Sequence, residues 1–129
     1  MKVYLAARYT RKDEIAQYVK LFEAVGIKVT STWMTEPHGG QVQLADVRDD
    51  QLREYALRDL EEIKAANIFI LFSESDQTAN RRGGRHVEHG YALALGKPIL
   101  VVGPRENIFH YLDNVEHYET IDEVINAMR

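Results

Sequence analysis

The chain has 129 residues, a net charge of -4 and no cysteine. This length fits one domain with its own core, and the negative charge argues against a nucleic-acid polymer as the main partner. The absence of cysteine excludes disulfides, thiol catalysis and every cysteine-ligated metal site.

Membrane insertion is also not expected. The longest apolar run, from Ile68 to Phe72, is too short to cross a bilayer. A strand pattern begins at Val3 with no cleavable signal before it. We therefore expect a cytoplasmic protein that has no membrane partner and acts on a small molecule.

The first third of the chain alternates between strand and helix patterns. Residues 3–7 predict a short buried strand, and an apolar period ending at Gly26 then predicts a helix with Thr10 as its cap. Residues 27–32 alternate as a second strand does, and residues 33–42 read as a long loop. The predicted buried face of the helix consists of Ile15, Val19, Phe22 and Val25.

The rest of the chain continues the alternation. A second helix is expected from about Leu44 or Asp49 to Ala66, followed by the most apolar strand at 68–72. The predicted buried positions of this helix are Leu52, Ala56, Leu60 and Ile63. The later predicted elements are a loop at 73–84, a helix at 84–95, a strand at 98–102, a short helix at 106–112, a strand near 117–119 and a final helix capped by Thr120 or Asp122.

Strands that alternate with helices at this spacing predict an α/β fold with a five-stranded parallel sheet. We expect a single flavodoxin-like or Rossmann-like domain over residues 1–129, a three-layer sandwich with strand order 2-1-3-4-5. Ligands bind such sheets at the carboxyl ends of the strands, where the strand order reverses. The segments delivered to that edge are residues 8–10, 32–40, 73–84 and 103–107.

Several kinds of chemistry lack support in the sequence. His86-Val87-Glu88 matches half of a zinc deaminase signature, but the paired cysteines that complete it are absent. His86 and His89 lie three apart without further ligands, so we expect solvent-facing histidines and no metal. Neither a P-loop nor a Gly-x-Gly-x-x-Gly motif occurs, and no cofactor is expected.

The remaining polar residues suit glycosyl transfer. Glu88 lies near a predicted helix start, where free N–H groups favour an ionised carboxylate. If the fold is as predicted, Tyr4 and Asp59 converge on it. A carboxylate nucleophile, a second acid at the leaving group and a phenol that holds the nucleophile are sufficient for retaining transfer at an anomeric carbon. An exposed helix residue at Asp59 and a core aromatic at Tyr4 are the alternatives.

Three motifs resemble a known family. The chain contains Val3-Tyr4-Leu5-Ala6, Arg58-Asp59-Leu60 and Gly84-Arg85-His86-Val87-Glu88-His89-Gly90-Tyr91-Ala92, the last followed by Gly96-Lys97-Pro98. Their order and content resemble the nucleoside 2-deoxyribosyltransferase superfamily, which includes 2'-deoxynucleoside 5'-phosphate N-hydrolases. The similarity spans nearly the whole chain.

The resemblance implies roles for individual residues. Glu88 matches the nucleophile, Tyr4 the tyrosine that contacts it, and Asp59 the aspartate near the base. Asn107 resembles a residue that neighbouring subunits lend to the site, which implies a homo-oligomer, a dimer or larger.

The chain departs from the family before the nucleophile. Arg81-Arg82-Gly83 stands where transferases often carry an aspartate. Arginine here, with Arg8 and the helix start at 10–12, suits a phosphate, and a solvated basic loop is the alternative. Tyr9 and Trp33 either stack on a base or cover the edge of the core. The predicted substrate-binding set is Arg8, Tyr9, Thr10, Trp33, Arg82, Gly84 and Asn107.

The leading hypothesis is cleavage or transfer at the N-glycosidic bond of a nucleoside or its 5'-phosphate through a glycosyl ester on Glu88. One alternative is a nucleotide-binding or sensing domain without turnover, which the arginine-rich segment motivates. The other is an NAD-type glycohydrolase, which uses similar glutamate chemistry.

Overall fold

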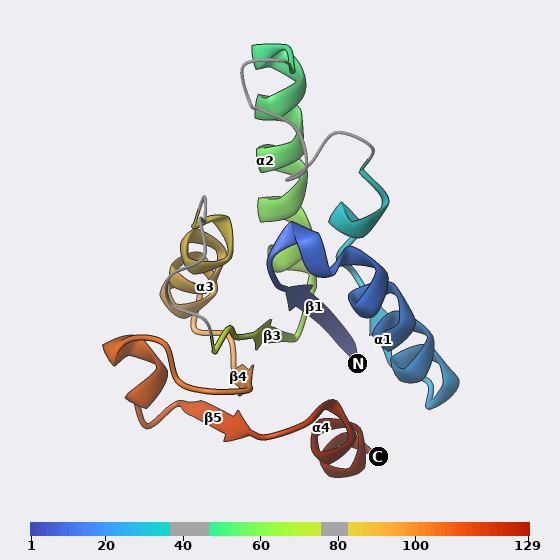
Figure 1. The fold of residues 1–129 in the computed structure, drawn as a ribbon, viewed down its shortest axis with the longest axis vertical. Coiled ribbons are helices and arrows are strands. Elements are labelled where there is room, and N and C mark those ends of the chain that lie inside the picture. Colours follow the sequence, from blue (N-terminus) through green and yellow to red (C-terminus); the bar gives the residue numbers. More distant parts are fainter. Residues whose placement is uncertain (37–46, 76–82) are drawn as a thin grey trace.

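The computed structural model of the protein describes residues 1–36, 47–75 and 83–129. Within these residues, five parallel strands form one sheet in the order β2-β1-β3-β4-β5, as predicted (Figure 1). The strands are β1 (Lys2–Ala6), β2 (Lys28–Val29), β3 (Ile68–Phe72), β4 (Ile99–Val102) and β5 (Val115–Tyr118).

Helices cover both faces of this sheet and complete three layers. Figure 1 shows α2 and α3 on one side of the strands and α1 and α4 on the other. The helices are α1 (Lys12–Ala24), α2 (Asp49–Ala65), α3 (Gly84–Ala94) and α4 (Ile121–Met128), with 3-10 turns η1 (Tyr9–Arg11), η2 (Trp33–Thr35) and η4 (Ile108–Tyr111). None of the described helices has the length and apolarity needed to span a membrane.

The core lies along the three central strands. In β3 every residue from Phe69 to Phe72 is at most 1% exposed, because helices cover both faces of the strand. Tyr4 of β1 pairs with Phe69 in the parallel register. The two rings stack with centroids 5.7 Å apart. The Tyr4 ring is therefore fixed within the core, and only its hydroxyl group is left to a polar partner.

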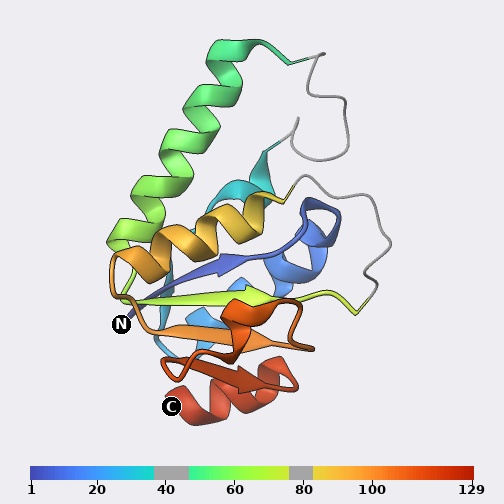
Figure 2. The same cartoon turned by 90° about the vertical axis from the view of Figure 1, so that its left-hand side faces the viewer.

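The second helix differs most from the prediction. Of the four positions expected to be buried, only Ile63 is, whereas Ala56 is exposed and Leu52 and Leu60 are half-buried. The reason is visible in Figure 2, where the first turns of α2 extend beyond the sheet and have no strand beneath them. Only the last turns of α2, which follow Asp59, pack on the sheet.

Smaller differences occur at the ends of elements. Thr10 does not cap α1, because it lies within η1 and the cap position is Arg11. Thr120 does cap α4, accepting a hydrogen bond from the N–H of Glu123. The predicted strand at 27–32 is limited to Lys28–Val29, and the expected helix at 106–112 is the shorter turn η4.

Lys97 gives the Gly96-Lys97-Pro98 motif a structural role. Its ammonium group donates to the carbonyl oxygens of Lys64 and Ala66, at 2.8 and 2.6 Å. These carbonyls lie at the C-terminal end of α2, where a cation is favoured by the helix dipole. The motif thus attaches α2 to the chain between α3 and β4.

At position 103, directly after β4, both the backbone conformation and a close neighbouring side chain require glycine. Its φ is +109°, and an added Cβ would lie 2.7 Å from the Ser73 hydroxyl oxygen. We expect Gly103→Ala to lower the free energy of unfolding by about 1–3 kcal/mol, since both strain and overlap would follow. Urea unfolding measures this, with Gly84→Ala as the control, because that position has open space and an ordinary φ. Equal stability of the two variants would contradict the prediction.

Candidate active site

The site is centred on a contact between the first strand and the third helix. The hydroxyl group of Tyr4 donates to Glu88 Oε2 at 2.7 Å. Tyr4 is fully buried and comes from β1, whereas Glu88 lies one turn into α3. Burial and the carboxylates nearby raise the pKa of Tyr4 well above its ordinary value, so the phenol keeps its proton and acts as a donor.

Asp59 completes the group from α2. Its carboxyl group is hydrogen bonded to that of Glu88. The three residues that the sequence analysis singled out, from a strand and two different helices, therefore meet at one point. The two acids are close enough to share one proton.

The ionisation of Glu88 differs from the prediction. Burial is the main reason that its pKa is raised to about 8, and the negative charge of Asp59 adds to this effect. The hydrogen bond from the Tyr4 hydroxyl group lowers the pKa of Glu88. The protonated form of Glu88 is therefore favoured at neutral pH. Glu88 lies a full turn from the start of α3, where the effect of the helix dipole is weaker.

The protonation of Asp59 follows from its own neighbours. Burial raises its pKa above the ordinary value, and the Arg58 guanidinium and a hydrogen bond from Glu88 oppose that rise. Their mutual hydrogen bond raises the pKa of Glu88 and lowers that of Asp59, so the two carboxyl groups titrate together as a pair.

A third carboxylic acid belongs to the site, and no pattern in the sequence predicted it. Glu36, directly after η2, is only 8% exposed and forms an ion pair with Arg58. Its charge also raises the pKa of Glu88. Glu36 lies in a segment without periodicity or a motif, so only the fold brings it to Asp59. Arg58 was within a recognised motif but had no predicted role.

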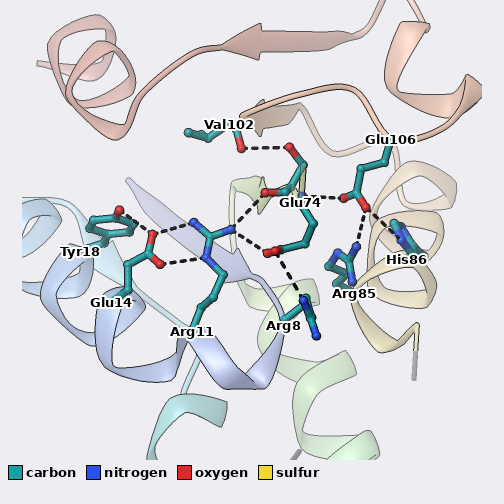
Figure 3. A network of polar contacts seen from close by, with 10 residues as sticks. Arg8, Arg11, Glu14, Tyr18, Glu74, Arg85, His86, Val102 and Glu106 are labelled. Carbon is teal, nitrogen blue, oxygen red and sulfur yellow. Dashed lines mark hydrogen bonds and ion pairs between the residues drawn. The ribbon is translucent and has the colours of Figure 1, made fainter. Parts of the chain in front are cut away.

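A second network joins the carboxyl ends of the central strands (Figure 3). Glu74 follows β3 and forms ion pairs with Arg8 at 3.7 Å and Arg11 at 2.9 Å. Its backbone N–H donates to Glu106 at 3.2 Å. Arg8, predicted to bind substrate, therefore lies at the expected edge of the sheet with Glu74 as an ionic partner.

From the ends of the strands, the network continues through Arg85 of α3 into the interior of the protein. Arg85 donates to Glu106 at 2.5 Å, and both side chains are only 2% exposed. His89 was expected to face solvent, but it is 3% exposed and stacks near Phe69, with centroids 6.1 Å apart. Burial, with the nearby His110 and His86, lowers its pKa to about 4, so this ring is neutral.

The aromatic residues that were predicted to contact a base form hydrogen bonds within the protein. Trp33 is 6% exposed, and its indole N–H donates to the carbonyl oxygen of Leu5 at 2.7 Å. Trp33 was predicted either to stack on a base or to cover the edge of the core, and its burial supports the second interpretation. The Tyr9 hydroxyl donates to the backbone oxygen of Glu36, and its ring lies 6.2 Å from that of Trp33. Thr10 is exposed in η1.

The other predicted ligands have different placements. Gly84 is the exposed first residue of α3. Asn107 accepts a hydrogen bond from the N–H of Phe109 at 2.9 Å and so caps η4 of its own chain. Arg82 lies outside the described residues. Within the described ranges, no group of three or more histidine, aspartate or glutamate side chains is arranged to hold a metal ion.

Comparison with known proteins agrees with this fold. Neither a protein-family model nor a curated protein matches the sequence. Among solved structures, a CMP N-glycosidase from Clostridium botulinum matches with a TM-score of 0.62 and 23% identity, covering 99% of this chain and 98% of that one. A 2-deoxyribosyltransferase from Bacillus psychrosaccharolyticus matches with a TM-score of 0.75 and 21% identity, covering 98% and 91%. The fold implied by the family resemblance is thus confirmed.

Proposed function

We propose that the chain belongs to the nucleoside 2-deoxyribosyltransferase superfamily and breaks the N-glycosidic bond of a nucleoside or its 5'-phosphate. The observation that carries the proposal is the hydrogen-bonded pair of Asp59 and Glu88, with Tyr4 donating to the second at 2.7 Å. The activities named for the two structurally similar enzymes support the same reaction class.

In the first step, Glu88 attacks C1' of the sugar as the bond to the base breaks. The attacking oxygen must lose its proton, and Asp59 is the hydrogen-bonded acceptor for it. The bonding electrons leave with the base, and Asp59 passes the proton to the base nitrogen. The products are a glycosyl ester on Glu88 and a neutral base, so protons and charge balance. The Tyr4 hydroxyl holds the carboxyl group of Glu88 throughout.

In the second step, water or another base attacks C1' and releases Glu88. Water gives up a proton as the ester breaks, and the acid pair takes it back, so the starting state returns. Two displacements at one carbon give overall retention of configuration. Hydrolase and transferase activity thus use one site and differ in the second nucleophile.

The substrate class is tested with a panel of products. Incubation with deoxynucleosides, ribonucleosides and their 5'-phosphates, with and without a free acceptor base, is followed by mass analysis. We expect a released base in each productive reaction, and a new nucleoside only where the base is the acceptor. Binding without base release across the whole panel would favour the sensing alternative, and release of nicotinamide from NAD would favour the glycohydrolase.

The pH dependence follows from the shared proton. The active form has one proton on the pair, because Asp59 must accept it and the base must finally receive it. We expect kcat/KM to fall above about pH 8, where Glu88 loses its proton, and to fall again in acid, where Asp59 gains one. Initial rates across pH measure this. An activity that keeps rising above pH 8 would contradict the assignment.

We also propose that the site is completed in a homo-oligomer, a dimer or larger, through the segment around Asn107. The neighbouring turn η4 supports this, because Ile108 and Tyr111 are 77% and 67% exposed and Phe109 is 53% exposed. Apolar side chains at adjacent positions are typical of a covered surface. Light scattering at assay concentration gives the mass that tests it.

A further inference from the structure

Arg58 is the cation nearest to the acid pair among the described residues, and several contacts fix its position. One guanidinium nitrogen donates to Asp59 Oδ1 at 2.9 Å and also pairs with Glu36. The guanidinium lies 5.3 Å from the centre of the Tyr55 ring, one turn earlier in α2. The side chain is 30% exposed, whereas Glu36 is 8% exposed.

The charges around Asp59 come from four elements. Arg58 and Glu62 belong to α2, with 4.0 Å between the Arg58 Nε atom and Glu62 Oε1. Glu62 itself is engaged by Thr32, whose N–H and hydroxyl donate to its carboxylate at 3.0 and 2.6 Å. The titratable and charged groups that face the pair are Tyr4 of β1, Glu36 after η2, and Arg58 and Glu62 of α2, while Glu88 of α3 is its second member.

We propose that Arg58 is a positioning residue that keeps Asp59 ionised and aimed at Glu88. Glu36 limits this effect of Arg58 on Asp59, because it pairs with the same guanidinium group. This inference rests on the proposed function, in which Asp59 must be ready to receive the proton of Glu88. Arg58 touches neither the sugar nor the base in this account. It acts through Asp59.

The physical reason is the balance of charge in a part-buried site. Asp59, Glu36 and Glu62 are acids, and Arg58 is the cation in contact with them. Without Arg58, burial and like charge would both favour a proton on Asp59. An Asp59 that carries its own proton cannot accept the proton of Glu88. Loss of Glu36 has the opposite effect, because it removes a competing carboxylate and leaves the guanidinium to Asp59.

The two variants that test this are Arg58→Gln and Glu36→Gln, which keep polar side chains of similar size. We expect the Asp59 carboxyl group to titrate about one unit higher than wild type in Arg58→Gln and lower than wild type in Glu36→Gln. Carboxyl carbon NMR of the ligand-free protein measures this without turnover. The acidic limb of the kcat/KM profile should move in the same two directions.

Controls separate this from general damage to the structure. Arg53→Gln removes an exposed arginine of the same helix and should leave both readouts at wild-type values. Arg58→Lys keeps the charge, so its Asp59 titration should lie closer to wild type than that of Arg58→Gln. If Arg58→Gln does not fold, the contrast between Glu36→Gln and Arg58→Lys still tests the proposal.

The outcomes distinguish the two proposals. Asp59 titrations that do not move, or that move in one direction in both variants, would overturn the role of Arg58, even with an active enzyme. Opposite shifts in a protein that releases no base from any substrate would support the role of Arg58 and overturn the proposed function.

Discussion

Glu88→Gln is expected to lower kcat/KM by roughly 10³-fold or more, which corresponds to about 4 kcal/mol of lost transition-state stabilisation. An amide cannot form the glycosyl ester. Its oxygen still accepts from Tyr4 and its N–H still donates to Asp59, so the hydrogen bonds of the site are kept. The loss is therefore one of chemistry and not of fold. Initial base-release rates on the best substrate measure it.

The stability of the same variant is an independent check. The pKa of Glu88 is raised from 4.5 to about 8 in the folded protein, so its contribution to stability is complete below pH 4.5 and is lost as pH rises to about 8. The loss approaches 1.4 kcal/mol per pH unit within that window. Glutamine does not titrate, so the Glu88→Gln protein should lack this decline and exceed wild type in stability at pH 8.

An exposed glutamate provides the matched control. Glu61 on α2 forms an ion pair with Lys64 at 3.7 Å, and 73% of its side chain is exposed. Glu61→Gln should keep wild-type activity and the wild-type decline in stability between pH 4.5 and 8. Full activity in Glu88→Gln would remove Glu88 from the nucleophile role, whatever its stability.

The largest expected loss of stability comes from Arg85→Met. Arg85 and Glu106 are each 2% exposed and lie 2.5 Å apart, with the Glu74 N–H as a further donor to Glu106 and His86 at 3.9 Å (Figure 3). Burial opposes the charged form of Glu106, but Arg85, the Glu74 N–H and His86 together outweigh it and hold the pKa of Glu106 below the ordinary value. Removing the arginine leaves a buried carboxylate without its cation, which costs about 3–5 kcal/mol.

A double variant distinguishes lost charge pairing from lost packing. In Arg85→Met with Glu106→Gln, the amide oxygen still accepts from the Glu74 N–H, and no buried charge remains. We expect this double variant to be more stable than Arg85→Met alone, which a double-mutant cycle with urea unfolding measures. A double variant that is less stable than the single one would show that packing, not the unpaired carboxylate, explains the loss.

The sheet was predictable because its signals are local. The buried run at 68–72 and the alternation of strands and helices predict a parallel sheet with right-handed connections, and the order expected for five such strands is the one observed. The reach of α2 was not predictable, because periodicity marks a possible buried face without showing where the sheet ends. Leu52 and Ala56 fit the pattern, yet the first turns of α2 have no strand beneath them.

The site was predictable only in part, because motifs are local and some properties of the site depend on residues that are distant in the sequence. Tyr4, Asp59 and Glu88 were found from motifs, and the fold brings them together. Their ionisation depends on burial and on neighbours from other elements, which a motif does not contain. Glu36 shows this clearly, because no pattern marks it, and yet it shares the guanidinium that pairs with Asp59.

The covalent ester on Glu88 can be trapped and identified. Protein mixed with its best substrate is quenched in acid within one turnover, digested and examined by mass spectrometry. We expect one added glycosyl group, carrying phosphate if the substrate does, on the peptide that contains Glu88 and on no other. Released base with no adduct at Glu88, or an adduct on a different residue, would contradict it.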